Sequence, residues 1–326
     1  MKDWIKATIA LIISIVTIAI IFHISNFEVS LSIIRTLDYK FLVIAFLLQV
    51  SFWLLWALRL KIIAKTLGSD VSYSYSLITT LSSMFFAAIT PSSAGGEPVR
   101  VKMVADVCKS YGTASAVVLI ERLLDAIFFA ISLPILVILT GFYVGLGFRV
   151  AGIFSLFLVL FIALLYTLLK NPKKIERFVE KLFKFTRRFL KGRTDEIKAK
   201  VITEALRFRV ALIDILKSKH YACIVFLLTI AMWLLGFLIP SFILLAMHLP
   251  PYFLFSITAQ VIIVVVSLIP LTPGSSGIAE GTMAYLYSAF VPQGALGVLV
   301  AIWRTITYYT NLFFGFLVSL KILKSG

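Results

Sequence analysis

Charged residues, and acidic residues above all, are scarce in this chain. Of its 326 residues only 14% are charged, with 15 Asp and Glu against 31 Lys and Arg, whereas 61% are hydrophobic and the mean hydropathy is +1.04. A soluble domain has about 25% charged and about 45–50% apolar residues. A soluble core of this size could not bury so much apolar surface. The composition therefore excludes a soluble enzyme, a disordered protein and a nucleic-acid-binding domain, and it predicts an all-α polytopic membrane protein.

Cysteine and histidine are also rare. The two cysteines, Cys108 and Cys223, lie far apart, and the three histidines, His23, His220 and His248, show no ligand-like spacing. These residues form neither a disulfide framework nor a metal-binding motif. We therefore expect no metal site and no cofactor, and no residue is predicted to be catalytic.

Long hydrophobic runs make up most of the sequence. Runs of 18 or more apolar residues predict membrane-spanning helices. A retained first helix is favoured over a signal peptide, because the residues that follow it make a poor cleavage site. The predicted spans are Trp4–Phe22, Tyr39–Leu60, Ala114–Thr140, Phe148–Leu169, Tyr221–Met247 and Ala295–Leu320. Two further apolar stretches, Tyr73–Ile89 and Tyr252–Ile269, lead into segments rich in Pro and Gly.

The distribution of positive charges predicts on which side of the membrane each segment lies. The stretch 170–219 holds 16 Lys and Arg with six acids and has helical periodicity, which indicates an amphipathic insertion in the cytoplasm that contacts anionic lipids of that leaflet. Arg59, Lys61 and Lys65 are assigned to the same side, as are both termini of this cell-membrane, multi-pass protein. The segments 73–109 and 252–290 must then begin and end on one side. Each is therefore predicted to be a re-entrant helical hairpin rather than a span.

The two hairpins carry related sequences. TPSSAGGE at 90–97 and TPGSSGIAE at 272–280 match at a constant offset of 182 residues, with one extra residue before the second Glu. The predicted fold is thus an inverted repeat of about six spanning helices plus two re-entrant hairpins. The first repeat covers 1–147, with hairpin 73–109. The second covers 148–326, with hairpin 252–290 and the basic insertion 170–219. Inverted repeats with broken helices are typical of transporters, whose site lies where the repeats meet.

The hairpin ends and two arginines form the predicted site. Broken helices expose unpaired N–H groups that favour anions, and Ser93 and Ser275 could cap the returning helices or donate to an anion. Arg122 and Arg304 fall about ten residues into spans, where a charge must face a partner or a polar cavity. The candidate substrate-binding residues are Arg122, Arg304, Glu97, Glu280, Ser93, Ser275, Gly95, Gly277, Arg100, Glu121 and Asp125.

Two interpretations of the arginines stay open at this point. In one they are structural ion pairs, with Arg122 paired to Asp125 in the same helix and Arg304 paired across to Glu97, Glu280 or Glu121. In the other they bind phosphate, for which the planar guanidinium is well suited. A substrate phosphate that displaces a carboxylate would combine the two. Glu97 and Glu280 are also candidates for proton coupling.

The text PSSAGGEPVR at 91–100, ERLLD at 121–125 and PGSSGIAE at 273–280 resembles the YbhN, or lysylphosphatidylglycerol synthase transmembrane, family, which includes the flippase module of MprF proteins. The similarity covers nearly the whole chain. It implies movement of a lipid with a polar headgroup across the bilayer. The chain contains no soluble aminoacyl-transferase domain of the MprF kind, so we expect no lysyl-lipid synthesis.

The leading functional hypothesis is a lipid transporter or flippase for an anionic or phosphate-bearing lipid, of the phospholipid or polyprenyl-phosphate type. A membrane-embedded lipid-modifying transferase is the alternative, with Glu97, Glu121, Asp125 and Glu280 as its acidic candidates. A third hypothesis is an accessory or scaffold subunit for cell-envelope lipid or glycan assembly. Membrane lipids are the expected partners, and homo-oligomerisation stays open. An ion channel is disfavoured, because no acidic ring or carbonyl-filter sequence is present.

Overall fold

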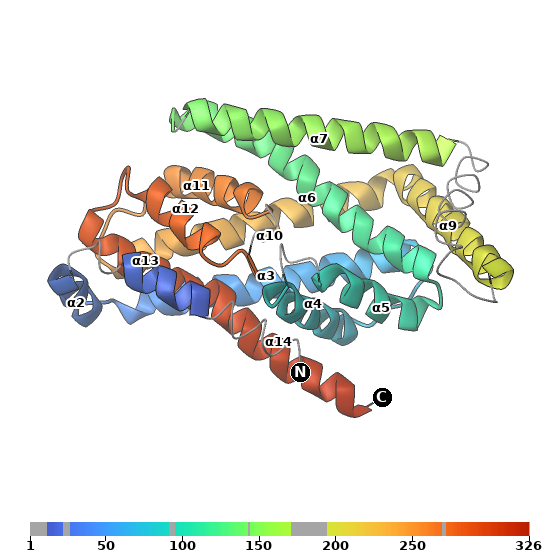
Figure 1. Cartoon of the computed structure of the whole chain (residues 1–326), viewed down its shortest axis with the longest axis horizontal. Helices are drawn as coiled ribbons and strands as arrows, with labels where there is room; N and C mark the ends of the chain where they lie inside the picture. The colour runs from blue at the N-terminus through green and yellow to red at the C-terminus, as the bar shows by residue number, and fades with distance from the viewer. Residues whose placement is uncertain are drawn as a thin grey trace.

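The computed structural model describes residues 12–21, 27–90, 95–142, 144–170, 194–268 and 272–325, and within these ranges the chain is helical and forms no strand (Figure 1). A first helix covers Ile12–Ile21. The others are α2 (Phe27–Arg35), α3 (Tyr39–Thr66), α4 (Tyr73–Ala88), α5 (Gly96–Cys108), α6 (Tyr111–Thr140), α7 (Val144–Lys170), α9 (Thr194–Lys217), α10 (Lys219–Ala246), α11 (Phe253–Val266), α12 (Ile278–Tyr287), α13 (Gln293–Arg304), the π-helical turn η1 (Thr305–Tyr309) and α14 (Thr310–Ser325).

Within the described ranges, four helices are long and apolar enough to cross a membrane, which supports a helical membrane protein. They are α3, α6, α10 and the part of α7 over Gly147–Thr167, and each coincides with a predicted span. The predicted span Ala295–Leu320 is helical as well, but η1 divides it. Of the predicted span Trp4–Phe22, only 12–21 lies within the described residues.

Helices α3 and α10 form the centre of the molecule and run antiparallel. The backbone N–H of Asp38, just before α3, donates to the carbonyl of Ala246 at the end of α10 (2.9 Å). These two helices occupy equivalent places in the predicted repeats. Their opposite direction is what an inverted repeat requires, although the repeat itself stays a prediction.

The segments between the long helices form two helical hairpins, α4/α5 and α11/α12. The first helix of each, with 16 and 14 residues, is about 24 and 21 Å long, which is shorter than the apolar core of about 30 Å. Figure 1 places α4/α5 toward the end of the molecule that carries α9, and α11/α12 toward the end that carries α2. Helix α4 packs on α14, and α11 packs on α6, so each hairpin contacts the last helix of the other half.

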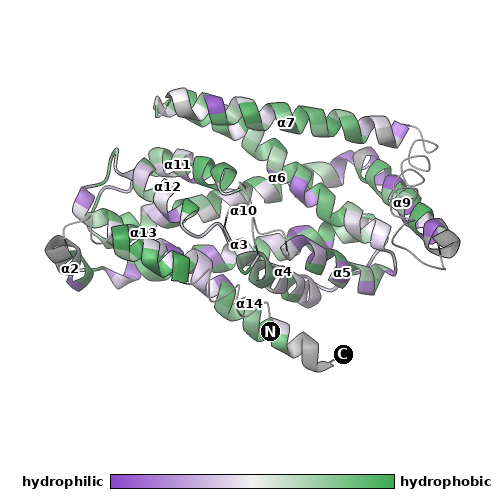
Figure 2. Cartoon of the chain, viewed as in Figure 1, coloured by the Kyte–Doolittle hydropathy of each residue, from purple (hydrophilic) through white to green (hydrophobic). Residues whose placement is uncertain are grey.

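Helix α7 lies along one edge of the molecule and is hydrophobic along most of its length (Figures 1 and 2). Only 6% of its apolar window is buried inside the protein, and Phe157 and Val159 are more than half exposed. A helix that is apolar all round and faces outward is stable only in lipid.

Helix α9 is the described part of the predicted basic insertion, and it docks on the start of α6. Ala211, Leu212 and Ile215 are buried between helices. The carboxylate of Glu204 accepts hydrogen bonds from Ser110 Oγ and from the backbone N–H of Gly112 (both 2.7 Å). The expected contact with the membrane surface therefore does not use this buried face. Residues 171–193, which carry the predicted apolar periodicity, lie outside the described residues.

Candidate functional site

A buried network of arginines and carboxylates joins α3, α5 and α6. Glu121 forms one ion pair with Arg59 (3.3 Å) and another with Arg100 (2.9 Å), and all three side chains are at most 2% exposed. Arg100 also donates to Ser83 Oγ on α4 (2.7 Å). Glu121 thus connects the first hairpin to the central helix. Removing one partner of such a buried pair would leave an uncompensated charge.

Asp125, one turn beyond Glu121, extends the network to α10. It accepts from Arg59 (2.6 Å), from Trp233 Nε1 (2.8 Å) and from Arg122 in its own helix (3.1 Å). Arg59 also donates to Thr229 on α10 (3.0 Å). The intrahelical pair between Arg122 and Asp125 is the one that the sequence suggests.

Arg59 lies inside the network and is fully buried. The charge distribution assigned it to the cytoplasmic side with Lys61, but its residue exposure is 0%. Two carboxylates inside a span need a cation, and Arg59 on the neighbouring helix supplies it. Arg100 is buried too. Burial does not decide the side of the membrane on which a residue lies, so the cytoplasmic assignment of Arg59 stays a prediction; isolated charges do not reveal a partner on another helix.

Arg122 differs from the other two arginines of the network in its exposure. Its guanidinium contacts Glu97 at the start of α5 (3.2 Å), and these side chains are 34% and 39% exposed. Arg122 thus reaches open space while it is held by two acids. A cation of this kind can exchange a carboxylate for an incoming anion without leaving a buried charge unpaired.

The indole of Trp56 lies among the three guanidinium groups. The guanidinium carbons of Arg100, Arg122 and Arg59 are 4.5, 5.1 and 5.8 Å from the ring centroid. Such contacts add a favourable cation–π attraction. Trp56 therefore keeps the cations close together, although like charges repel.

The second half of the chain contains an ion pair at the positions that the predicted repeat aligns with Glu97 and Arg122. Arg304 contacts both oxygens of Glu280 (2.8 and 2.9 Å), and both side chains are at most 6% exposed. Glu280 also accepts from the backbone N–H of Gly277 (2.8 Å) and from Ser14 of the first helix. The guanidinium of Arg304 packs on the ring of Tyr308 (4.6 Å). Of the acids suggested for Arg304 from the sequence, Glu280 is the partner.

The ends of the two hairpins touch. The backbone N–H of Gly274 donates to the carbonyl of Thr90 (3.0 Å), and the Tyr308 hydroxyl donates to the carbonyl of Ala88 (3.0 Å). Gly274 has a φ of +56°, and a Cβ there would lie 2.5 Å from Ala88 O. Only glycine allows this close approach without strain.

Several of the predicted hairpin residues form hydrogen bonds within their own hairpin. Ser275 Oγ donates to the carbonyl of Ser267 (2.6 Å) rather than capping α12, because its φ of +54° turns it back toward the end of α11. The carboxylate of Glu280 caps α12 instead, because it accepts from the backbone N–H of Gly277 just before the helix. The N–H of Gly95 donates to Thr90 Oγ1 (2.8 Å). Ser93 lies outside the described residues.

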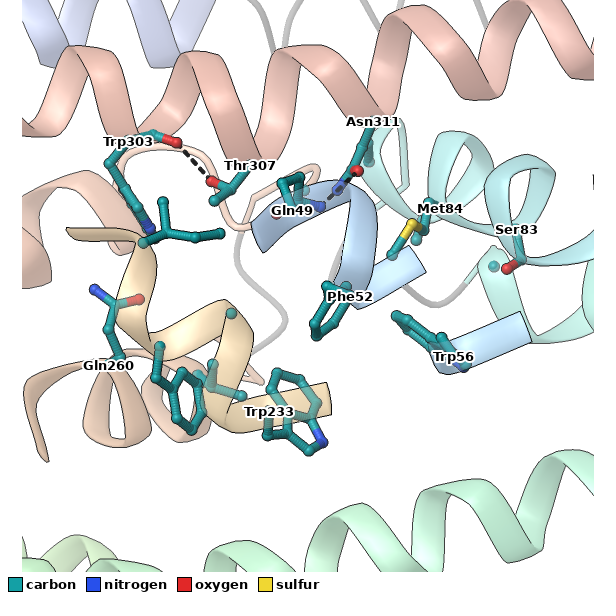
Figure 3. Close-up of a pocket in the computed structure, with 18 of the residues that line it drawn as sticks. Gln49, Phe52, Trp56, Ser83, Met84, Trp233, Gln260, Trp303, Thr307 and Asn311 are labelled. Carbon is teal, nitrogen blue, oxygen red and sulfur yellow. Dashed lines mark hydrogen bonds between the residues drawn. The ribbon is translucent and has the colours of Figure 1, made fainter. Parts of the chain in front are cut away.

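A cavity of about 340 Å³ opens between the hairpins and the central helices (Figure 3). Among the predicted site residues, Glu97, Arg100 and Arg122 line it, whereas Arg304 and Glu280 are not among its described lining residues. Arg122 and Arg304 thus do not share this cavity among its described lining residues, and their role in binding a substrate stays a prediction. Gln49, Trp56, Trp233, Gln260 and Asn311 also line the cavity, and sequence reasoning missed them because a neutral polar residue in an apolar helix gives no charge signal.

The charged end of the cavity holds donors without a partner. Among the described residues, Arg122 Nη2, Arg100 Nε and Trp56 Nε1 are buried and make no hydrogen bond. Buried donors are normally satisfied. These three groups could therefore bind an acceptor such as a phosphate oxygen.

Known proteins resemble this chain over most of its length. The chain matches the lysylphosphatidylglycerol synthase TM region over residues 7–315. A UPF0104 membrane protein of Archaeoglobus fulgidus is 48% identical over 319 residues, which cover 97% of each chain. UPF0104 membrane proteins of Methanocaldococcus jannaschii (24% over 332 residues, 98% of this chain and 96% of the other) and Pyrococcus horikoshii (25% over 336 residues, 98% of each) are also similar. The chain therefore belongs to the lysylphosphatidylglycerol synthase TM family, a family of membrane proteins with a role related to membrane lipids.

Proposed function

We propose that this protein moves an anionic, phosphate-bearing lipid across the cell membrane, with the phosphate bound in the cavity between the two hairpins. The observation that carries the proposal is the state of Arg122: its side chain is one-third exposed and lines the cavity, and its buried Nη2 has no hydrogen-bond partner among the described residues. In this proposal both termini and α9 lie on the cytoplasmic side.

The size of the cavity fits a headgroup rather than a whole lipid. Ligand pockets have volumes of roughly 300–1,000 Å³, and about 340 Å³ is at the lower end of this range. The apolar tails would stay in the bilayer, next to helices such as α7, while the headgroup passes the hairpin ends. Tails in the bilayer cost no desolvation, so the protein needs to supply polar contacts only to the headgroup.

The ion pairs of the cavity support transport better than acid–base chemistry. Glu97, Glu121 and Asp125 each contact an arginine, so each carboxylate is engaged in balancing charge. An incoming phosphate could take the place of Glu97 on Arg122, and the displaced carboxylate, which is 39% exposed, would then be hydrated. The phosphate would leave as easily, because Glu97 restores the pair.

Reconstitution in liposomes tests the proposal. The protein is incorporated with labelled anionic phospholipids or polyprenyl phosphates, and the fraction of label that becomes accessible on the opposite leaflet is measured. We expect transport by the wild type and by Arg149→Gln, which changes an exposed arginine on α7, and loss of transport in Arg122→Gln. Absence of transport for every lipid by folded protein would refute the proposal. Chemical turnover of the lipid would favour the transferase instead.

A further inference from the structure

The end of the cavity away from the arginines is polar but neutral. Figure 3 shows Gln260, Trp303 and Thr307 on one side of the view, Trp56 and Ser83 on the other, and Gln49, Phe52 and Asn311 between them. Arg100 donates to Ser83, which places the cations on the Trp56 side. The cavity thus has a cationic end, and Gln260, Gln49 and Asn311 line the remainder, which we call the amide end.

The amide groups are held in fixed orientations by neighbours behind the cavity wall. Tyr287, buried on α12, accepts from Gln260 Nε2 (3.2 Å), and Figure 3 shows the Gln260 oxygen turned toward the centre of the view. Trp53 Nε1 and Gln49 Nε2 both donate to Asn311 Oδ1 (2.8 and 3.3 Å). Within the described residues, this leaves the oxygens of Gln49 and Gln260 as acceptors and the amide nitrogen of Asn311 as a donor.

This combination of donors and acceptors matches hydroxyl groups. A hydroxyl both donates and accepts, so several hydroxyls on one headgroup could satisfy amide oxygens and the amide nitrogen at the same time. The indoles of Trp233 and Trp303 supply flat apolar walls, against which the C–H face of a polyol can pack. Pockets with apolar walls and a few placed polar groups are typical of ligand sites.

A cationic headgroup fits this end poorly. Glu97 is the acidic residue among the described lining residues, and it is paired with Arg122 at the other end. An ammonium group at the amide end would be desolvated without a carboxylate to compensate it, which is costly.

We propose that the lipid carried by this protein has an uncharged, polyhydroxylated headgroup beyond its phosphate, of the glycerol, inositol or sugar type, rather than an aminated one. The phosphate lies at Arg100 and Arg122, and the hydroxyls contact Gln260, Gln49 and Asn311. This inference rests on the proposed function, because it takes the same cavity as the headgroup site.

Lipid retention by purified full-length protein tests the inference. Protein in detergent is mixed with phosphatidylinositol, phosphatidylglycerol, phosphatidic acid or phosphatidylethanolamine, and bound lipid is counted by native mass spectrometry. We expect phosphatidylinositol and phosphatidylglycerol to be retained several-fold better than the other two. Soluble inositol phosphate and glycerol phosphate form a second arm, which shows whether the headgroup binds without its tails.

Variants of Gln260 separate the inference from the proposed function. Gln260→Leu should weaken phosphatidylinositol retention about five-fold, the effect of one lost hydrogen bond, and leave phosphatidic acid unchanged. Gln260→Glu should shift the preference toward phosphatidylethanolamine. Thr258→Val, on the same helix but outside the described cavity lining, is the matched control.

The outcomes are distinct. Equal retention of phosphatidylinositol and phosphatidic acid by the wild type, or an unchanged ranking in folded Gln260→Leu, overturns the inference and leaves the proposed function standing. Failure to retain any anionic lipid overturns both. If the Gln260 variants do not fold, the ranking of the four lipids by the wild type decides the question.

Discussion

The N–H of Gly274 donates a hydrogen bond to the carbonyl oxygen of Thr90 (3.0 Å), and this contact joins the ends of two hairpins that lie far apart in the sequence. The Tyr308 hydroxyl makes a second contact, to Ala88 of the first hairpin. A headgroup that crosses the membrane between the hairpins must pass these backbone contacts. We therefore regard the arrangement as the closed form of the proposed pathway.

Gly274→Ala should separate the hairpin ends. The left-handed backbone at this residue costs a non-glycine residue about 1–2 kcal/mol, and the new Cβ would lie 2.5 Å from the Ala88 carbonyl oxygen. We expect a lower midpoint of thermal unfolding and an altered transport rate. Gly281→Ala is the control, because a Cβ there meets nothing within 4 Å and alanine favours helix. Equal stability of the two variants would contradict the proposed close approach.

Arg59 and Arg122 should respond differently to replacement. Arg59→Met leaves Glu121 and Asp125 short of a buried partner, and we expect a loss of about 3–5 kcal/mol in the free energy of unfolding. Arg122→Met should cost less stability, because Arg122 is one-third exposed, and should abolish transport. Denaturant unfolding of both variants measures the first effect and liposome transport the second. The reverse ranking in stability would show that Arg122 is the structural cation.

The docking of α9 on α6 should depend on pH through Glu204. Burial opposes ionisation of this carboxyl, but the hydrogen bonds from Gly112 and Ser110 and the charge of Arg207 outweigh it, so the pKa of Glu204 lies below its ordinary value of 4.5. A depressed folded-state pKa stabilises the folded form above pH 4.5, and this contribution is lost as the pH falls through the folded-state pKa.

We therefore expect hydrogen exchange of α9 amides to rise below pH 4.5 in the wild type, relative to intrinsic rates. In Glu204→Gln the exchange should be raised at neutral pH and should vary less with pH. Asp214→Asn, an exposed acid on the same helix, is the control and should behave as the wild type does. A pH response that persists unchanged in Glu204→Gln would assign it to another group.

Cysteine labelling tests the predicted hairpins. In a variant without Cys108 and Cys223, single cysteines are placed at Asp70 and Lys109, before and after α4/α5, and at His248 and Ser288, around α11/α12. Re-entrant hairpins predict that the first two sites react with a membrane-impermeant reagent from one side and the last two from the other. Sites within one pair that label from opposite sides would instead show that the segment crosses the membrane.

Hydropathy along the chain was sufficient to predict the long helices. The predicted spans Tyr39–Leu60, Ala114–Thr140, Phe148–Leu169 and Tyr221–Met247 coincide with α3, α6, α7 and α10, with shifts of a few residues at their ends. Spans follow from local composition, because about 20 apolar residues in a row have no stable state in water. The family was identified from three short motifs at 91–100, 121–125 and 273–280, and the match over residues 7–315 confirms it.

The partners of the charged residues were predictable only in part. The sequence predicts the pair between Arg122 and Asp125, because both lie on one helix face. For Arg304 it leaves several acids as candidate partners, and Glu280 is among them. It gave no indication that Arg59 is the cation of Glu121.

By itself, then, the sequence determined that this chain is helical, lies in a membrane and contains charges that need partners inside it. The tertiary structure decided which charges pair, which arginine faces the cavity and which neutral amides form its other end. The physical reason is that helix formation in an apolar medium depends on neighbouring residues, whereas the position of a side chain depends on which helices pack together.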